Sequence, residues 1–302
     1  MPATTALLGS YQLICASSPS LAVLELCYNQ FRGSIPPELG SCSMLRVLKL
    51  PPSLTNCTNL ITIDLKSNNF SGQLAKVNFS KLPNLKTLDL MHNSFSGKIP
   101  ESIYSCSNLV ALRLSSNKFH GQLSEKLGNL KSLSFLSLSN NSITNITSAL
   151  QILRRSKNLT TLLIGLNFMN ETMPGDDGIV GFENLQIGQL RALRSLNFSF
   201  NDLTGQIPQS ISNLTSLQVL DLSTNNLTGG IPAALNNLHF LSAFNISNND
   251  LEGPIPSGGQ FNTFQNSSFD GNPKLCGSML IHKCGSASPP LIHSKLQHKK
   301  GW

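Results

Sequence analysis

One short apolar pattern returns along most of the chain and constrains its fold more than any other feature. The pattern is L-x-x-L-x-L-x-x-N, as in Leu109, Leu112, Leu114 and Asn117. A single copy is apolar on only one face of its extended core and cannot bury that face alone, so copies are expected to stack. Its third apolar position recurs at Leu26, Leu50, Leu65, Leu90, Leu114, Leu138, Ile164, Phe198, Leu222 and Ile246.

Two further columns accompany the apolar pattern. An asparagine ends each copy, and its amide is expected to satisfy backbone groups of the turn that follows. A second phrase, F/L-x-G-x-I-P, comes next, with Gly permitting a tight backbone and Pro fixing φ. The asparagine column is Asn29, Asn68, Asn93, Asn117, Asn141, Asn167, Asn201, Asn225 and Asn249.

The G-x-I-P form, as in Gly97–Ile99–Pro100, resembles the plant-specific subclass of leucine-rich repeats. This subclass occurs in cell-surface receptor kinases, receptor-like proteins and polygalacturonase inhibitors. The resemblance implies an α/β solenoid, a right-handed superhelix of about nine or ten coils with a parallel β-sheet on its concave face. Expected domains are an irregular segment (1–20), the solenoid (21–256), a C-terminal cap (257–284) and a disordered basic tail (285–302).

The repeat breaks its phase twice, since most anchors are 24 to 26 residues apart. Between Leu50 and Leu65 the step is 15 residues, which predicts local distortion at 49–53, with the break at 50/51. Between Ile164 and Phe198 it is 34 residues, with the break at 175–192. At the second break an inserted loop and a deletion that joins two half-repeats are both open, and the deletion is favoured.

Three stretches of the sequence carry a closer resemblance. Residues 167–174, 234–256 and 268–277 look like the ectodomains of phytosulfokine-receptor-like, that is tyrosine-sulfated-peptide-receptor-like, plant proteins. In that family a non-repeat island helps to bind a sulfated peptide, a transmembrane helix follows the cap, and receptor kinases add a kinase domain. This chain is expected to be a truncated relative without island, helix or kinase.

The cysteines divide into two groups. Cys276 and Cys284 fall in and after the phrase F-x-G-N-x-x-L-C-G, which looks like the C-terminal cap of secreted plant ectodomains and implies that the two form a disulfide. Cys42, Cys57 and Cys106 precede repeat leucines by three residues, and small buried apolar residues are preferred there over disulfides.

The resemblance places the chain outside the cell or at its surface, and N-x-S/T sequons favour the same compartment. The start of the chain is a poor signal peptide, and no apolar stretch is long enough to span a membrane. The candidate glycosylation sites are Asn56, Asn69, Asn78, Asn140, Asn145, Asn158, Asn170, Asn197, Asn213, Asn226, Asn245 and Asn266.

The residue types argue for recognition rather than catalysis. Histidines lack ligand spacing and no kinase motif occurs, so no catalytic residue, metal or cofactor is expected. Binding is expected on the outward strand positions of the concave face, where Phe135 and Leu163 near Arg113 would form a contact patch; scattered surface residues are an equally weighted alternative. The candidate ligand-binding residues are Asp64, Asp89, Arg113, Phe135, Ser137 and Leu163.

The leading hypothesis is therefore a non-catalytic ligand- or protein-recognition module of a plant cell-surface receptor-like protein, in peptide-hormone or defence signalling. Its partners would be a peptide or protein ligand and a co-receptor kinase. Nucleic acid is not expected as a partner, because the repeats show no basic stripe. The alternatives are a secreted polygalacturonase-inhibitor-like protein and a truncated product without binding activity.

Overall fold

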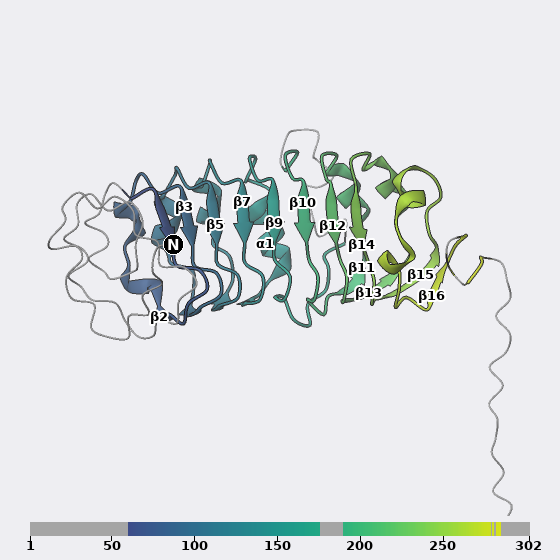
Figure 1. Cartoon of the computed structure of the whole chain (residues 1–302), viewed down its shortest axis with the longest axis horizontal. Coiled ribbons are helices and arrows are strands. Elements are labelled where there is room, and N and C mark those ends of the chain that lie inside the picture. The colour runs from purple at the N-terminus through teal and green to yellow at the C-terminus, as the bar shows by residue number, and fades with distance from the viewer. Residues whose placement is uncertain (1–59, 176–189, 279, 281, 285–302) are drawn as a thin grey trace, which may run out of the picture.

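The computed structural model describes residues 60–175, 190–278, 280 and 282–284. The first phase break at 50/51, the tail after 284, and Asn56, Cys42 and Cys57 lie outside these residues. Within them the chain forms one elongated ribbon of stacked coils, as the repeat predicts (Figure 1). The fold is a leucine-rich-repeat solenoid with a parallel sheet and few helices.

Each coil contributes one three-residue strand to an eight-stranded parallel sheet on the concave face. Neighbouring strands pair in register, so that Leu88 lies beside Leu112 and Leu112 beside Leu136. The strands are β1 (Thr62–Asp64), β3 (Thr87–Asp89), β5 (Ala111–Arg113), β7 (Phe135–Ser137), β9 (Thr161–Leu163), β10 (Ser195–Asn197), β12 (Val219–Asp221) and β14 (Ala243–Asn245).

Two shorter parallel sheets follow the asparagine turns. The first consists of β2 (Ser71–Gln73), β4 (Ser94–Gly97), β6 (Lys118–Gly121) and β8 (Ser142–Ile143). The second consists of β11 (Thr204–Gln206), β13 (Asn226–Gly229), β15 (Asp250–Pro254) and β16 (Lys274–Cys276). The glycine of the G-x-I-P phrase lies in these strands with positive φ, for example 86° at Gly205, which explains its recurrence.

Helical turns close the coils behind the sheet. One α-helix is found among the described residues, α1 (Ile146–Leu153), and the other turns are 3-10 helices. The 3-10 helices span Leu74–Lys76, Phe79–Lys81, Glu101–Ser105, Glu125–Asn129, Gln209–Asn213, Ala233–Asn237, Gly259–Thr263 and Asn266–Ser268.

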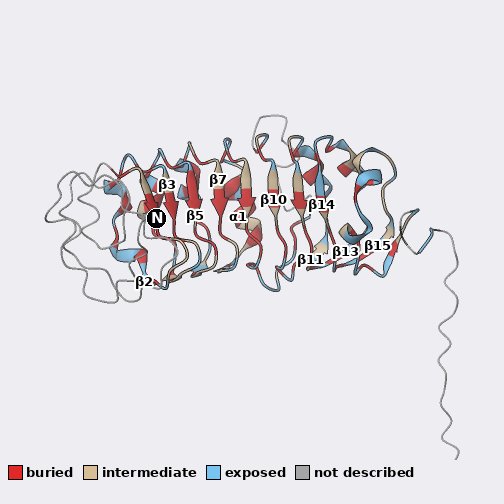
Figure 2. Cartoon of the chain, viewed as in Figure 1, coloured by how far each residue is buried: buried red, intermediate tan, exposed pale blue. Residues whose placement is uncertain are grey.

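The repeat leucines form a continuous core between the sheet and these turns (Figure 2). The middle residue of every concave strand is buried, including Leu88, Leu112 and Leu136. Cys106 is buried and unpaired, as predicted; burial raises the pKa of its thiol to about 11, which suits a small core residue.

The asparagine column forms the expected hydrogen-bonded ladder. Asn93 shows the geometry: its Nδ2 donates to the Leu65 carbonyl (2.9 Å) and the Leu90 carbonyl (3.1 Å), while its Oδ1 accepts from the Phe70 amide (3.0 Å). One amide therefore joins two coils. Asn272 continues the ladder into the cap, where its Oδ1 accepts from the Leu251 amide (3.1 Å) and a disulfide joins Cys276 to Cys284.

The long step leaves the concave sheet intact. Thr161 of β9 pairs with Ser195 of β10 in the same register as the other strands, although 34 residues separate them. Residues 176–189, for which the sequence left an inserted loop and a deletion both open, lie outside the described residues, so that choice stays a prediction. Behind the sheet the layers do change, because one isolated bridge, Thr172 to Thr204, is found between β8 and β11.

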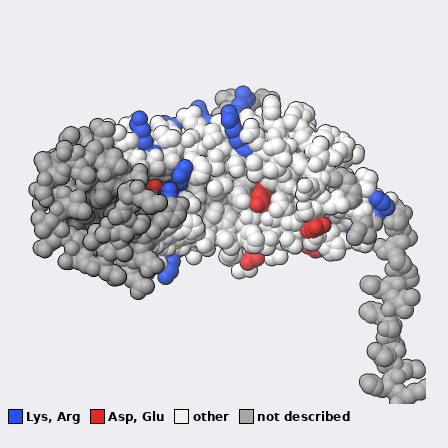
Figure 3. Space-filling model, in the orientation of Figure 1, with Lys and Arg blue, Asp and Glu red and all other residues white. Residues whose placement is uncertain are grey.

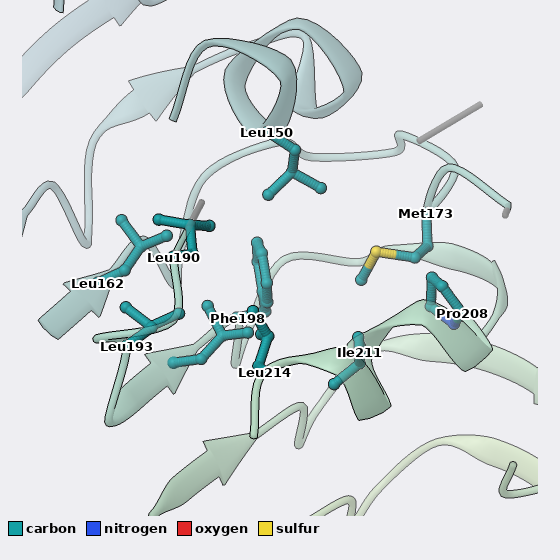
Figure 4. Close-up of a pocket in the computed structure, with 10 residues that line it drawn as sticks. Leu150, Leu162, Met173, Leu190, Leu193, Phe198, Pro208, Ile211 and Leu214 are labelled. Atoms are coloured by element: carbon teal, nitrogen blue, oxygen red, sulfur yellow. The ribbon is translucent and has the colours of Figure 1, made fainter. Parts of the chain in front are cut away.

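A small apolar cavity marks the same junction. Its volume is about 20 Å³, and the lining side chains point toward one another from α1 and the following coils (Figure 4). The space is about that of one water molecule and has no polar lining, so it is a packing gap rather than a ligand site. The lining residues are Leu150, Leu162, Met173, Leu190, Leu193, Leu196, Phe198, Pro208, Ile211 and Leu214.

Candidate binding surface on the concave sheet

The concave sheet presents two rows of outward residues. Since the middle residue of each strand is buried, the first and third residues face away from the core. The first row is Thr62, Thr87, Ala111, Phe135, Thr161, Ser195, Val219 and Ala243, and the second is Asp64, Asp89, Arg113, Ser137, Leu163, Asn197, Asp221 and Asn245.

Arg113 is the centre of the predicted patch. Its Nη1 lies 3.4 Å from Oδ2 of Asp89 on β3, and its guanidinium carbon lies 4.7 Å from the centre of the Phe135 ring on β7. The carboxylate on β3 and the aromatic face on β7 thus hold the cation of β5 from its two flanking strands. The Arg113 side chain remains 38% exposed, so part of the guanidinium faces solvent.

Asp89 supports this cation from a buried position. Asp89 is 2% exposed, and this burial raises the pKa of its carboxyl. Neighbouring Asp64 raises that pKa further. The Met91 amide, 3.2 Å from Oδ1, and Arg113 lower it. Asp64 itself pairs with Lys66 (Nζ–Oδ2, 3.3 Å). Asp89 therefore positions Arg113 instead of facing a ligand.

The other predicted residues differ in how far they reach the surface. Ser137 is 1% exposed and its hydroxyl is hydrogen-bonded to that of Ser115, so its side chain is buried and does not reach the concave surface. Phe135 and Leu163 are half-buried instead of fully exposed. The structure thus brings Asp89, Arg113 and Phe135 together, with Asp64 and Leu163 on either side, and the ligand-binding role of the set stays a prediction.

Beyond Leu163 the concave surface becomes polar. Asn197 accepts from the amide of Ser199 (3.0 Å), and Asp221 accepts in the same way from Ser223 (3.0 Å). The Asn197 amide nitrogen donates to Asp221 Oδ2 (3.1 Å), which joins the two strands. A glycan on Asn197 would be attached to this same nitrogen.

The described sequons differ in exposure. Three are half-buried: Asn145, Asn197 and Asn245. Eight are exposed: Asn69, Asn78, Asn140, Asn158, Asn170, Asn213, Asn226 and Asn266. Their glycosylation stays a prediction, and exposure favours the second group.

Sequence reasoning missed an apolar pair at the rim of the sheet. Leu166 and Phe200 are 38% and 50% exposed and lie in successive coils, with φ values of 55° and 58°. Left-handed backbone is unusual for bulky residues. The signal was present in the repeat, because the other coils place polar residues there: Ser67, His92, Ser116, Asn140, Thr224 and Asn248.

Two kinds of feature are absent from the described part of the chain. No group of three or more His, Cys, Asp or Glu side chains is arranged there to hold a metal ion. None of the helices in the described ranges has the length and apolar character needed to cross a bilayer.

The sheet, the asparagine ladder and the concave rows together define a leucine-rich-repeat protein. Leucine-rich-repeat family models match residues 20–42, 58–119, 192–214 and 216–238. The chain is homologous to plant receptors that carry this repeat. Receptor-like protein 3 of Arabidopsis thaliana is 53% identical over 117 residues, which cover 38% of this chain and 16% of that protein. Phytosulfokine receptor 1 of the same plant is 45% identical over 85 residues, covering 28% of this chain and 8% of the receptor.

Solved structures give the same picture over more of the chain. The ectodomain of the Arabidopsis thaliana receptor kinase GASSHO1/SCHENGEN3, in complex with CASPARIAN STRIP INTEGRITY FACTOR 2, superposes with a TM-score of 0.72 at 30% identity, covering 90% of this chain and 35% of that one. The Arabidopsis receptor kinase HAESA, in complex with the peptide hormone IDA and the co-receptor SERK1, gives 0.67 at 31% identity, covering 86% and 43%. A plant ice-binding protein gives 0.69 at 27% identity, covering 87% and 84%. The chain thus spans less than half the length of the receptors it resembles.

Proposed function

We propose that this chain is a non-catalytic recognition module of a plant cell-surface receptor-like protein and that it binds a peptide or protein ligand on its concave sheet. The homologous proteins are plant receptors, and two of the similar ectodomains are complexes with peptide ligands. A co-receptor kinase as a second partner is suggested by the HAESA complex with SERK1.

The arrangement of Asp89, Arg113 and Phe135 supports this proposal most directly. The guanidinium is held by a buried carboxylate and an aromatic ring before any ligand arrives. A cation fixed in this way loses little conformational entropy on binding, which favours Arg as an interface anchor. An extended ligand with a carboxylate or similar anion over β5 and an apolar group toward Leu163 would match this surface.

Calorimetric titration with a peptide panel tests the proposal. The panel is phytosulfokine with and without sulfation, CASPARIAN STRIP INTEGRITY FACTOR 2, and IDA, since these peptides appear in the names of the similar receptors. Binding of one peptide that Arg113→Gln weakens at least about tenfold would support the concave site. Arg155→Gln, outside the concave rows, is the matched control and should bind as the wild type does.

Inhibition of a polygalacturonase by the same protein is the assay for the alternative function. Inhibition without peptide binding would replace the receptor proposal by the inhibitor one. The absence of both activities would favour a product without a binding role.

A further inference from the structure

Charge is distributed unevenly along the solenoid. Residues 60–175 and 190–199 contain fourteen Lys and Arg against five Asp and Glu, whereas residues 200–278 contain one Lys against five acidic residues. Figure 3 shows several Lys and Arg side chains along the upper long edge of the described coils and others elsewhere on this face, with Asp and Glu away from that edge. The excess of positive charge among these repeats therefore lies in residues 60–175 and 190–199, and the later repeats carry a small negative excess.

The basic edge lies where the coils enter the strands of the concave sheet. The entry segments of β3, β7, β9 and β10 are residues 81–86, 131–134, 154–160 and 190–194, and they contain no Asp or Glu. The expectation that the repeats lack a basic stripe is therefore wrong for this edge. Its cations are Lys81, Lys86, Lys131, Arg154, Arg155, Lys157, Arg191 and Arg194.

Two of these cations meet at Gly128, and a third lies one coil further. Lys131 donates from Nζ to the Gly128 carbonyl (2.6 Å), and the Cβ and Cδ atoms of Arg155 lie 3.4 Å from where a Cβ on Gly128 would be. Lys157 occupies the position of Lys131 one coil further, and Nδ2 of the neighbouring Asn158 donates to the Lys131 carbonyl (2.8 Å). All three residues are exposed.

Arg194 extends the group into the next coil, where its amide donates to the Thr160 carbonyl (2.8 Å). Like charges gathered in this way repel one another, and an anion bound among them relieves the repulsion. Successive coils repeat at about 4.8 Å along the solenoid, so from β7 to β10 the edge offers a line of cations to a linear polyanion.

We propose that this edge binds an acidic polysaccharide of the polyuronate class, lying along the solenoid across the entry segments of β7, β9 and β10. A uronate chain carries one carboxylate per sugar, a spacing of the same order as the coil repeat. The choice of a polysaccharide rests on the proposed cell-surface location, because such polymers are met outside the cell. Single-stranded nucleic acid fits less well, because the described coils place no exposed aromatic ring among these cations for bases to stack on.

The test compares two triple variants of the full chain. Both variants keep the acidic residues of 176–189, so the two differ only in which three cations are removed. Lys131→Ser/Arg155→Ser/Lys157→Ser removes the three cations at and beside Gly128. Lys76→Ser/Lys98→Ser/Lys118→Ser removes the same charge from exposed positions elsewhere. Binding to polygalacturonate is measured by biolayer interferometry over a range of salt concentrations, with the fully methyl-esterified polymer as the uncharged probe.

The edge variant should bind polygalacturonate at least about tenfold more weakly, with a shallower salt dependence, while the control variant stays within about twofold of the wild type. The methyl-esterified polymer should not bind. Equal losses in both variants, or binding of the esterified polymer, would overturn the proposal.

Duplex DNA and vesicles containing phosphatidylserine serve as competing polyanions. Either one binding more tightly than polygalacturonate at the same salt concentration would overturn the assignment to a polysaccharide. Arg113→Gln should leave polygalacturonate binding unchanged, so failure of the concave peptide site and failure of the basic edge can be told apart.

Discussion

The coils of β3 and β5 and the junction between β9 and β10 share one concave sheet but differ in the layers behind it. In the regular coils the asparagine turn leads into the second sheet and then a 3-10 helix. At the junction the second sheet is reduced to one bridge, α1 replaces a 3-10 helix in the preceding coil, and a cavity lies in the core. Strand pairing is therefore the strict part of this fold. At the junction the asparagine ladder changes its bonds, because Asn201 donates to the Phe198 carbonyl of its own coil and accepts from the Asn167 amide, and the outer layer changes with it.

The largest expected effect comes from the ladder itself. Asn225 is buried, accepts from the Leu203 amide (3.0 Å), and donates to the Phe198 and Leu222 carbonyls (both 3.0 Å). Asn225→Ala leaves these buried backbone groups without partners and should cost about 3–4 kcal/mol in the free energy of unfolding. Urea denaturation of unglycosylated protein measures the loss.

Asn226→Ala is the matched control, because this neighbour is exposed. A change within about 0.5 kcal/mol is expected for it. Similar losses for the two variants would show that the ladder bonds add little to stability.

The second prediction probes the junction through Gly165. A Cβ at this position would lie 2.5 Å from the Ser199 carbonyl oxygen and 2.9 Å from Asn197 Oδ1, so the coils of β9 and β10 are too close for any side chain. Gly165→Ala should cost about 2–3 kcal/mol and speed hydrogen exchange of the Ile164 and Leu166 amides, which donate to the next coil.

Gly175→Ala provides the comparison, since a Cβ there meets no atom of the described residues within 4 Å. It should leave both stability and exchange nearly unchanged. If exchange at Ile164 and Leu166 stayed as slow in Gly165→Ala as in the wild type, the two coils would have room for a methyl group after all.

The third prediction concerns the helix that distinguishes the junction. Glu171 accepts from the amides of Asn145 and Ile146 (both 2.6 Å), so its carboxylate caps α1 from the next coil. Glu171→Gln should destabilise the fold by about 1 kcal/mol, measured by urea denaturation. Glu125→Gln, at an exposed 3-10 turn, should change stability by less than about 0.5 kcal/mol, and equal effects would contradict the capping role.

Periodicity predicted the parts of the molecule that repeat. The strand positions, the Leu core and the amides of Asn93 and Asn225 follow from a pattern whose every copy sees the same neighbours. Glu171 was not predicted as a cap, because its partners lie in the preceding coil and no repeat position encodes them.

Side-chain exposure within the candidate site was harder to predict. The sequence placed Asp89, Arg113 and Phe135 in neighbouring outward rows, but it did not indicate that Asp89 is buried beneath the guanidinium. Burial there depends on the size of the side chains in adjacent coils, which repeat spacing does not specify. The basic edge was missed for a related reason: its cations belong to several repeat positions and gather only when the coils stack.

The smallest expected effect is a pH dependence at Asp89, in the regular coils. Burial raises the pKa of this carboxyl above its ordinary value of 3.8, so the folded state holds the proton more tightly than the unfolded chain. Stability should therefore fall as pH rises from the ordinary value through the raised one, and level off above it. The amide that replaces the carboxyl in Asp89→Asn has no proton to lose in this range, so the variant should gain stability relative to the wild type across that window. Urea denaturation at a series of pH values measures the difference, and parallel curves for the two proteins would mean that Arg113 and the Met91 amide fully offset the burial of Asp89.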